Sequence, residues 1–281
     1  MNDLSSKKIR YSFEFFPPKT EKGCEKLQST RDQLAALNPE YFSVTYGAGG
    51  STRDNTRETV VAIKRAGLDV APHLSFGADD EGLVGDLLQS YVDSGISRVV
   101  ALRGDLPSGM GAQRMVYANE LVEFIRERFA DHFSIAVACY PEVHPQAKGY
   151  LDDVGYLKQK FDAGADYAVT QYFYNTDAYA HFIEECVKQR IDKPIVPGIM
   201  PITNVDNLLR FSEMCGADIP RWLRKSLHDR QSDPQSVISY GEEVVTKLCE
   251  RLIDQGVQSF HFYTMNQYQP TANICLSLIH I

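Results

Sequence analysis

Short apolar runs alternate with longer amphipathic stretches along nearly the whole chain. Eight runs are rich in β-branched and aromatic residues, which is typical of buried strands. They are residues 11–16, 41–46, 69–76, 97–105, 134–142, 167–174, 194–201 and 259–265. The segments between them have helical periodicity. In residues 151–161, Leu151, Val154, Leu157 and Phe161 recur at the spacing of one helix face. The pattern therefore predicts a repeated strand–helix unit.

A glycine recurs where a predicted helix gives way to a strand. It does so in residues 64–70, 93–100, 162–169 and 254–260. Glycine suits the left-handed cap that ends a helix before a short loop. Eight such units in 281 residues predict an α/β fold, a (β/α)8 TIM barrel. A doubly wound open sheet is the alternative.

Two further features concern domain organisation. Roughly sixty residues separate the seventh and eighth runs, including residues 219–227, and they predict extra helices there. The chain has no linker rich in proline, glycine and serine. We therefore predict a single catalytic domain over residues 1–281.

Composition and charge narrow the range of partners. Hydrophobic residues make up 43% of the chain, and the net charge is −8 without a long basic run. This argues against nucleic acid or an anionic membrane as the main partner. The first residues lack the apolar core of a signal peptide, and no stretch approaches the about 20 apolar residues of a membrane span. We expect a cytoplasmic protein. The six cysteines lack CxxC spacing, so we expect free thiols rather than a disulfide or zinc framework.

Polar and titratable residues gather where the predicted strands end. They are Glu14, Thr45, Tyr46, His73, Arg103, Gly104, Asp105, Tyr140, Glu142, His144, Gln171 and Asn266. Strand ends also meet water, which would explain one or two of them. A set that recurs at nearly every strand is better explained by a ligand site, because barrel enzymes place their chemistry at the carboxyl ends of the strands.

Glu14 is the most unusual of these residues, because it lies between two phenylalanines. Alternation places Tyr11, Phe13 and Phe15 toward the helices and Glu14 inside the barrel. Burial disfavours the charged form of a carboxyl group, so a raised pKa and a general-acid role are expected. The alternative is a structural ion pair, with Arg103 as the candidate partner.

Other local patterns are less specific. Arg103 and Asp105 offer a second carboxylate beside an arginine, or a simple ion pair. Residues 47–52 resemble a phosphate-binding loop but lack the GK[ST] ending. His144 lies in a turn bracketed by prolines and is as often structural as functional. The strand ends carry no lysine, which argues against a Schiff-base aldolase. The first strand has no HxH, which argues against a barrel metallohydrolase. The absence of GxSxG argues against a serine hydrolase.

Nine stretches together resemble one family, the methylenetetrahydrofolate reductases, in its short bacterial form. They are SFEFFPPKT (12–20), FSVTYGAGG (42–50), APHLSF (71–76), ALRGDLP (101–107), YPEVHPQAK (140–148), DAGADYAVTQYFY (162–174), PGIMPI (197–202), IPRW (219–222) and FHFYTMN (260–266). They occur in family order along nearly the whole chain. Eukaryotic relatives carry an added regulatory domain, which we do not expect here.

The resemblance implies a barrel that holds FAD without a Rossmann fingerprint. It implies reduction of 5,10-methylenetetrahydrofolate to 5-methyltetrahydrofolate with NAD(P)H, of which NADH is the expected donor. The kinetics would be ping-pong, and the product would supply methyl groups for methionine synthesis. A homo-oligomer is also implied.

The resemblance also assigns site residues. Glu14 would be the general acid, and the charge of Asp105 would favour a cationic folate intermediate. FAD would contact Tyr46, Ala48, His73, Arg103, Gly104, Asp105, Tyr117, Ala118, Tyr140, His144, Ala147, Asp153, Tyr156 and Lys160. Folate or nicotinamide would contact Thr45, Gln171, Asn207, Phe211 and Gln267. No metal is implied.

Three positions depart from the family pattern. Gln267 stands where relatives usually have an arginine near folate, and Tyr156 and Gln159 replace more polar or basic residues on the FAD side. Two other functions stay open. One is a flavin-free barrel lyase or transferase that uses Glu14 and Asp105, and the other is a folate or flavin carrier without turnover.

Overall fold

The computed structural model describes residues 8–46, 50–76, 81–103 and 117–279. The strands are β1 (Arg10–Phe15), β2 (Tyr41–Val44), β3 (Val70–Leu74), β4 (Arg98–Ala101), β5 (Ser134–Cys139), β6 (Tyr167–Thr170), β7 (Ile195–Val196), β8 (Gly198–Ile199) and β9 (Ser259–Tyr263). The helices are α1 (Glu21–Ala35), α2 (Gly50–Arg65), α3 (Glu81–Asp93), α4 (Ala118–Phe129), α5 (Tyr150–Asp162), α6 (Thr176–Lys188), α7 (Val205–Cys215), α8 (Arg221–His228), α9 (Pro234–Asp254) and α10 (Thr271–Leu278).

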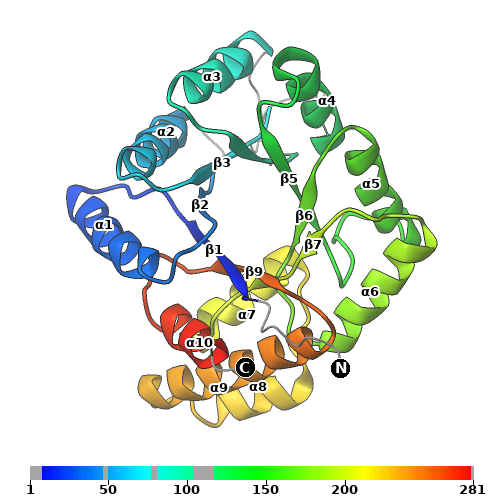
Figure 1. The fold of residues 1–281 in the computed structure, drawn as a ribbon. Coiled ribbons are helices and arrows are strands. Elements are labelled where there is room, and N and C mark those ends of the chain that lie inside the picture. The colour runs from blue at the N-terminus through cyan, green and yellow to red at the C-terminus, as the bar shows by residue number, and fades with distance from the viewer. Residues whose placement is uncertain (1–7, 47–49, 77–80, 104–116, 280–281) are drawn as a thin grey trace, which may run out of the picture.

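The strands form a ring of parallel pairs surrounded by helices (Figure 1). Each predicted strand is present, and the run 194–201 is divided at Pro197 into β7 and β8. Proline has no N–H to donate to a ladder, so the strand is interrupted there. The first half pairs with β6, and the second pairs with β9. Because β7 and β8 are joined through Pro197, the ring closes. The predicted (β/α)8 TIM barrel is confirmed, and the open sheet is excluded.

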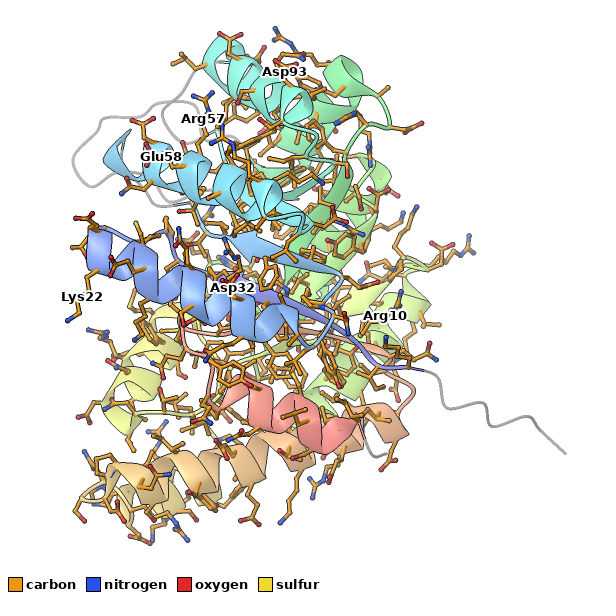
Figure 2. The ribbon with its side chains drawn as sticks, turned by 60° about the vertical axis from the view of Figure 1, so that its left-hand side comes forward. Arg10, Lys22, Asp32, Arg57, Glu58 and Asp93 are labelled. Carbon is orange, nitrogen blue, oxygen red and sulfur yellow. The ribbon has the colours of Figure 1, made fainter. Side chains whose placement is uncertain are left out.

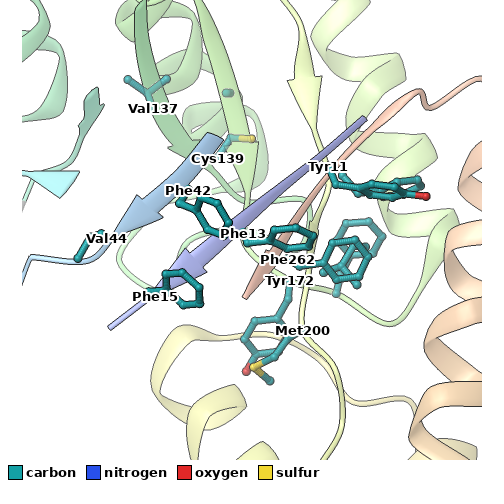
Figure 3. Close-up of a cluster of buried hydrophobic side chains, with 14 of the residues drawn as sticks. Tyr11, Phe13, Phe15, Phe42, Val44, Val137, Cys139, Tyr172, Met200 and Phe262 are labelled. Carbon is teal, nitrogen blue, oxygen red and sulfur yellow. The ribbon is translucent and has the colours of Figure 1, made fainter. Parts of the chain in front are cut away.

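The two faces of the strands differ in character, as alternation predicted for β1. Phe13 and Phe15 are fully buried among the apolar side chains outside the ring (Figure 3). The ring of Phe15 stacks on Phe42 of β2 with centroids 5.3 Å apart. The barrel interior holds a separate apolar cluster formed by Tyr41, Ala71, Val100, Ala136 and Val169. Burial on both faces fixes the register of each strand, and hence the position of every inward side chain.

Helices α1, α2 and α3 present charged residues to solvent, including the labelled Lys22, Asp32, Arg57, Glu58 and Asp93 (Figure 2). Their apolar faces lie against the ring.

The predicted apolar stripe of α5 is only partly correct. Val154, Leu157 and Phe161 are buried, but Leu151 is 62% exposed. At about 100° per residue, Leu151 lies roughly 90° from the centre of the other three. It therefore falls at the edge of the buried face.

The remaining features of the fold match the predictions made from glycine and loop length. Gly67, Gly95, Gly164 and Gly256 all have positive φ at the ends of helices. Helices α7, α8 and α9 occupy the long interval before β9, and α8 corresponds to the predicted segment 219–227.

The six cysteines are free thiols. None of the described helices combines the length and the apolarity that crossing a membrane requires.

Candidate active site

Several candidate residues lie outside the described part of the chain. They are Ala48, Gly104 and Asp105, together with residues 47–49 of the predicted loop 47–52. The other candidates lie at or beyond the carboxyl ends of the strands and on the helices that follow.

Glu14 lies inside the barrel between two histidines from other strands. Its side chain is almost fully buried. One carboxylate oxygen, Oε2, is 3.2 Å from His73 Nε2 on β3 and 3.5 Å from His261 Nε2 on β9. The predicted alternative, an ion pair with Arg103, is not formed among the described residues, because Arg103 donates a hydrogen bond to Gln146 instead. The barrel thus brings three titratable side chains together.

The predicted direction of the Glu14 pKa shift is wrong. Burial alone would raise the pKa, but the charges and hydrogen bonds of His73 and His261 outweigh it and hold the pKa at about 2. When the imidazoles are charged, the carboxyl group is therefore ionised and the protons of the cluster lie on the imidazoles. The ability to donate a proton at this place therefore belongs to Glu14, His73 and His261 together rather than to Glu14 alone.

The chain after β9 holds the backbone of Glu14 in place. Thr264 Oγ1 donates to the Glu14 carbonyl oxygen at 2.6 Å. The Asn266 side chain accepts from Phe16 N and donates to the Phe16 carbonyl oxygen, both at 2.8 Å. These bonds fasten the end of β1 to the end of β9. Asn266, predicted at a strand end, therefore has a structural role beside Glu14.

The loop between β5 and α5 carries several predicted FAD residues in one network. The rings of Tyr140 and His144 meet edge to face with centroids 4.5 Å apart. His144 N donates to Asp153 Oδ2 at 2.9 Å, and Ala147 N donates to the His144 carbonyl oxygen. Burial raises the pKa of Asp153. The loop is thus held in one shape by its own candidate residues.

Other predicted FAD residues differ in how accessible they are. Lys160 donates to the Ala138 carbonyl oxygen at 2.6 Å, and burial lowers the pKa of its ammonium group. The Lys160 ammonium group therefore points toward the backbone of β5. Tyr117 precedes α4, where Ala118 is the first residue, and is 53% exposed; Tyr156 on α5 is exposed as well.

The predicted folate and nicotinamide residues lie on four separate segments. Thr45 N donates to the Phe15 carbonyl oxygen, and Gln171 N donates to that of Cys139, which ties both residues to neighbouring strand ends. Phe211 on α7 is half-buried, with the Arg210 guanidinium 5.1 Å from its ring centroid. Asn207, one turn earlier, is exposed, and Gln267 follows Asn266 in the loop after β9.

His261 was not among the predicted site residues. A lone histidine in the aromatic run 259–265 resembles a core residue. Alternation along β9, with Phe260 and Phe262 facing outward, would have placed it inside the barrel, but it does not indicate which groups it meets.

Glu142, in the same loop as His144, yields a pH prediction. Burial raises the pKa of Glu142 to about 7, although its Oε2 accepts a hydrogen bond from Asp218 N at 2.8 Å. The folded protein thus holds this proton more tightly than the unfolded chain. Its stabilising contribution is fully present below about pH 4.5 and is lost as the pH rises through about 7.

Glu142→Gln removes that titration while keeping a carbonyl oxygen for Asp218 N. At pH 8, the free energy of unfolding of the variant should exceed that of the unchanged protein by about 1 kcal/mol, a value discounted for partial solvent exposure. At pH 5, the two free energies should agree within about 0.5 kcal/mol. Urea unfolding at both pH values measures the difference. An equal difference at both would contradict the assignment.

The comparisons with known proteins concern the family and the fold. The family described as Methylenetetrahydrofolate reductase matches residues 1–278. The chain is 41% identical over 272 residues to the 5,10-methylenetetrahydrofolate reductase of Pectobacterium carotovorum subsp. carotovorum, covering 96% of this chain and 90% of that one. It is 38% identical to methylenetetrahydrofolate reductase (NADH) 1 of Arabidopsis thaliana over 95% of this chain and 48% of that one.

A solved structure shares the fold at low sequence identity. It is an uncharacterized protein from Clostridium thermocellum that binds two copies of 5-methyl-5,6,7,8-tetrahydrofolic acid. The TM-score is 0.68 at 18% identity, over 97% of this chain and 94% of that one. The sequence comparisons and the barrel together show that this chain belongs to the methylenetetrahydrofolate reductase family.

Proposed function

We propose that this chain reduces 5,10-methylenetetrahydrofolate to 5-methyltetrahydrofolate, with NADH as electron donor and FAD as bound cofactor. The cycle is ping-pong, and its product supplies methyl groups for methionine synthesis. The observation that carries the proposal is the buried Glu14 beside two imidazoles in a chain of this family. The printed name of the Arabidopsis relative supports NADH as the donor.

The residues at the strand ends fit a flavin nucleotide. The buried His73 Nε2 makes no well-aligned hydrogen bond within the described residues, although it lies 3.2 Å from Glu14, so it can donate to a ligand oxygen or nitrogen. Arg103 supplies a half-buried cation for a phosphate. Tyr117 and Tyr156 expose aromatic rings on which a flat ring can stack. A flavin held by these residues would supply hydride transfer between the nicotinamide and the folate carbon.

The role of Glu14 follows from the chemistry of the substrate. The methylene carbon bridges two nitrogens in a five-membered ring and accepts a hydride only after the ring opens to an iminium cation. Opening requires a proton on the departing nitrogen. Both imidazoles contact Oε2 of Glu14, and no described residue bonds Oε1. Glu14 Oε1 is therefore the oxygen that passes the proton to the substrate.

The folate and nicotinamide ligands would share the side chains of Thr45, Gln171, Asn207, Phe211 and Gln267 in turn. Phe211 offers a ring on which either flat ligand can stack. Gln267 lacks the charge of an arginine, so the folate tail would be held by hydrogen bonds at this position rather than by an ion pair.

Steady-state turnover tests the proposal against the two alternatives. The purified protein, reconstituted with FAD, is expected to oxidise many equivalents of NADH only when 5,10-methylenetetrahydrofolate is present. It should then form 5-methyltetrahydrofolate, identified by mass spectrometry. A protein that binds FAD and folate without product formation would be a carrier. Failure to bind FAD would leave the flavin-free lyase or transferase as the better description.

A further inference from the structure

Below Glu14, the barrel interior contains a buried imidazole whose hydrogen bonds suit two protonation states. His261 is 2% exposed. Its Nδ1 is 2.7 Å from Ser12 Oγ, and its Nε2 is 3.4 Å from Ser43 Oγ and 3.5 Å from Glu14 Oε2. An ionised carboxylate only accepts hydrogen bonds, so Nε2 carries a hydrogen when it faces Glu14.

Ser12 allows the second nitrogen to gain or lose a proton without an unpaired group. When Nδ1 is bare, the Ser12 hydroxyl donates to it. When Nδ1 carries a hydrogen, the hydroxyl accepts from it and turns its own hydrogen toward the Phe260 carbonyl oxygen, 3.5 Å from Ser12 Oγ. The neutral and the charged imidazole are therefore both satisfied in the same place.

The other groups that face His261 do not compete for this proton near neutral pH. The Tyr41 ring stacks on His261 with centroids 6.0 Å apart, and the Tyr263 ring meets it edge-on at 5.4 Å. Burial raises the pKa of both phenols well above the usual value. Beyond Tyr41 lie Tyr167, whose pKa burial also raises, and the guanidinium of Arg98.

We propose that His261 is a positioning residue that orients the Glu14 carboxylate and, together with His73, holds the proton that Glu14 delivers to the folate nitrogen. The inference depends on the proposed function. As the carbon–nitrogen bond of the folate ring breaks, a proton passes from an imidazolium to Glu14 and from Glu14 Oε1 to the departing nitrogen, which leaves the carboxylate ionised and one imidazole neutral. Water then reprotonates that imidazole before the next turnover. One proton is thus consumed in each cycle, as the reduction requires.

His261→Gln tests this because glutamine keeps a hydrogen-bonding amide but cannot store a proton. A cluster with one proton site fewer binds its last proton less tightly. Flavin reoxidation by 5,10-methylenetetrahydrofolate is followed by stopped flow from pH 6 to pH 9. The rate of the variant should begin to fall at a lower pH than that of the unchanged protein. Ser12→Ala, which removes the acceptor for Nδ1–H, should move the profile in the same direction and covers the case in which His261→Gln does not fold. His132→Gln is the matched control, because His132 lies before β5 and contacts the Ile96 carbonyl oxygen rather than Glu14.

A second readout does not depend on turnover. Losing His261 should raise the pKa of the Glu14 carboxyl group by about one unit. The ¹³C chemical shift of the Glu14 carboxyl carbon, in protein labelled at its glutamates, reports this pKa. The signal that disappears in Glu14→Gln is the one from Glu14. Unchanged pH profiles and an unchanged Glu14 titration in both variants, or an equal loss of rate at every pH, would overturn the inference. If the unchanged protein is not reoxidised by the folate at any pH, the proposed function fails instead.

Discussion

Glu14→Gln is expected to slow flavin reoxidation by 5,10-methylenetetrahydrofolate by about 10²- to 10⁴-fold, the usual contribution of a general acid. Glutamine matches the size of glutamate and can still contact His73 and His261, but it has no acidic proton to deliver. Reduction of the flavin by NADH needs no proton from this position and should stay within about twofold of the original rate. Stopped-flow absorbance of the two half-reactions separates these effects.

Glu142→Gln provides the matched control for this experiment. It makes the same chemical change in the loop after β5, where Glu142 accepts a hydrogen bond from the backbone of Asp218 rather than contacting the histidine pair. Its folate half-reaction should stay within about threefold of the unchanged protein. Normal reoxidation in the Glu14 variant would remove Glu14 from the proton-transfer role. Equal losses in both half-reactions would indicate a damaged site instead.

Gly198→Ala is expected to destabilise the barrel by roughly 3 kcal/mol, because the position has no room for a side chain. Gly198 begins β8, just after the break at Pro197. A Cβ there would collide with the Thr170 carbonyl oxygen and lie 2.6 Å from Tyr263 Cε2. The Tyr263 hydroxyl donates to that same carbonyl at 2.6 Å, and Gly198 N donates to Thr170 Oγ1 at 2.9 Å. The added methyl group therefore presses apart the strands that close the ring.

Gly155→Ala is the matched control for the stability experiment. Gly155 lies within α5, and apart from the backbone of its own helix and its two chain neighbours a Cβ there would meet no heavy atom within 4 Å. Alanine is the better helix former, so this variant should gain up to about 1 kcal/mol. Thermal and urea unfolding measure both changes. If Gly198→Ala unfolds like the unchanged protein, the close contact at β8 does not limit ring closure.

The sequence predicted the barrel because its signals are local. Periodicity shows which segments are strands, and the helix-ending glycines, such as Gly67 and Gly164, show where each unit ends. Pro197 lies within the seventh run, and its missing N–H explains why that strand is divided. Leu151 was misplaced because a count of apolar positions does not show where the edge of a buried face lies.

The candidate site was harder to predict, because its chemistry depends on contacts between distant strands. The position of Glu14 inside the barrel followed from alternation along β1. The sign of its pKa shift did not, because His73 and His261 come from β3 and β9 and meet the carboxylate only when the ring closes. Lys160 similarly resembled a phosphate ligand in the sequence, whereas its ammonium group donates to a backbone carbonyl of β5.

The most direct test of the proposed function is the visible spectrum of the purified, FAD-loaded protein under anaerobic conditions. NADH is added first, and 5,10-methylenetetrahydrofolate follows. We expect the flavin band to bleach with NADH and to return with the folate, which would demonstrate both half-reactions in one sample. A band that bleaches and does not return with the folate would contradict folate reduction at Glu14, and a band that never bleaches would contradict NADH as the donor.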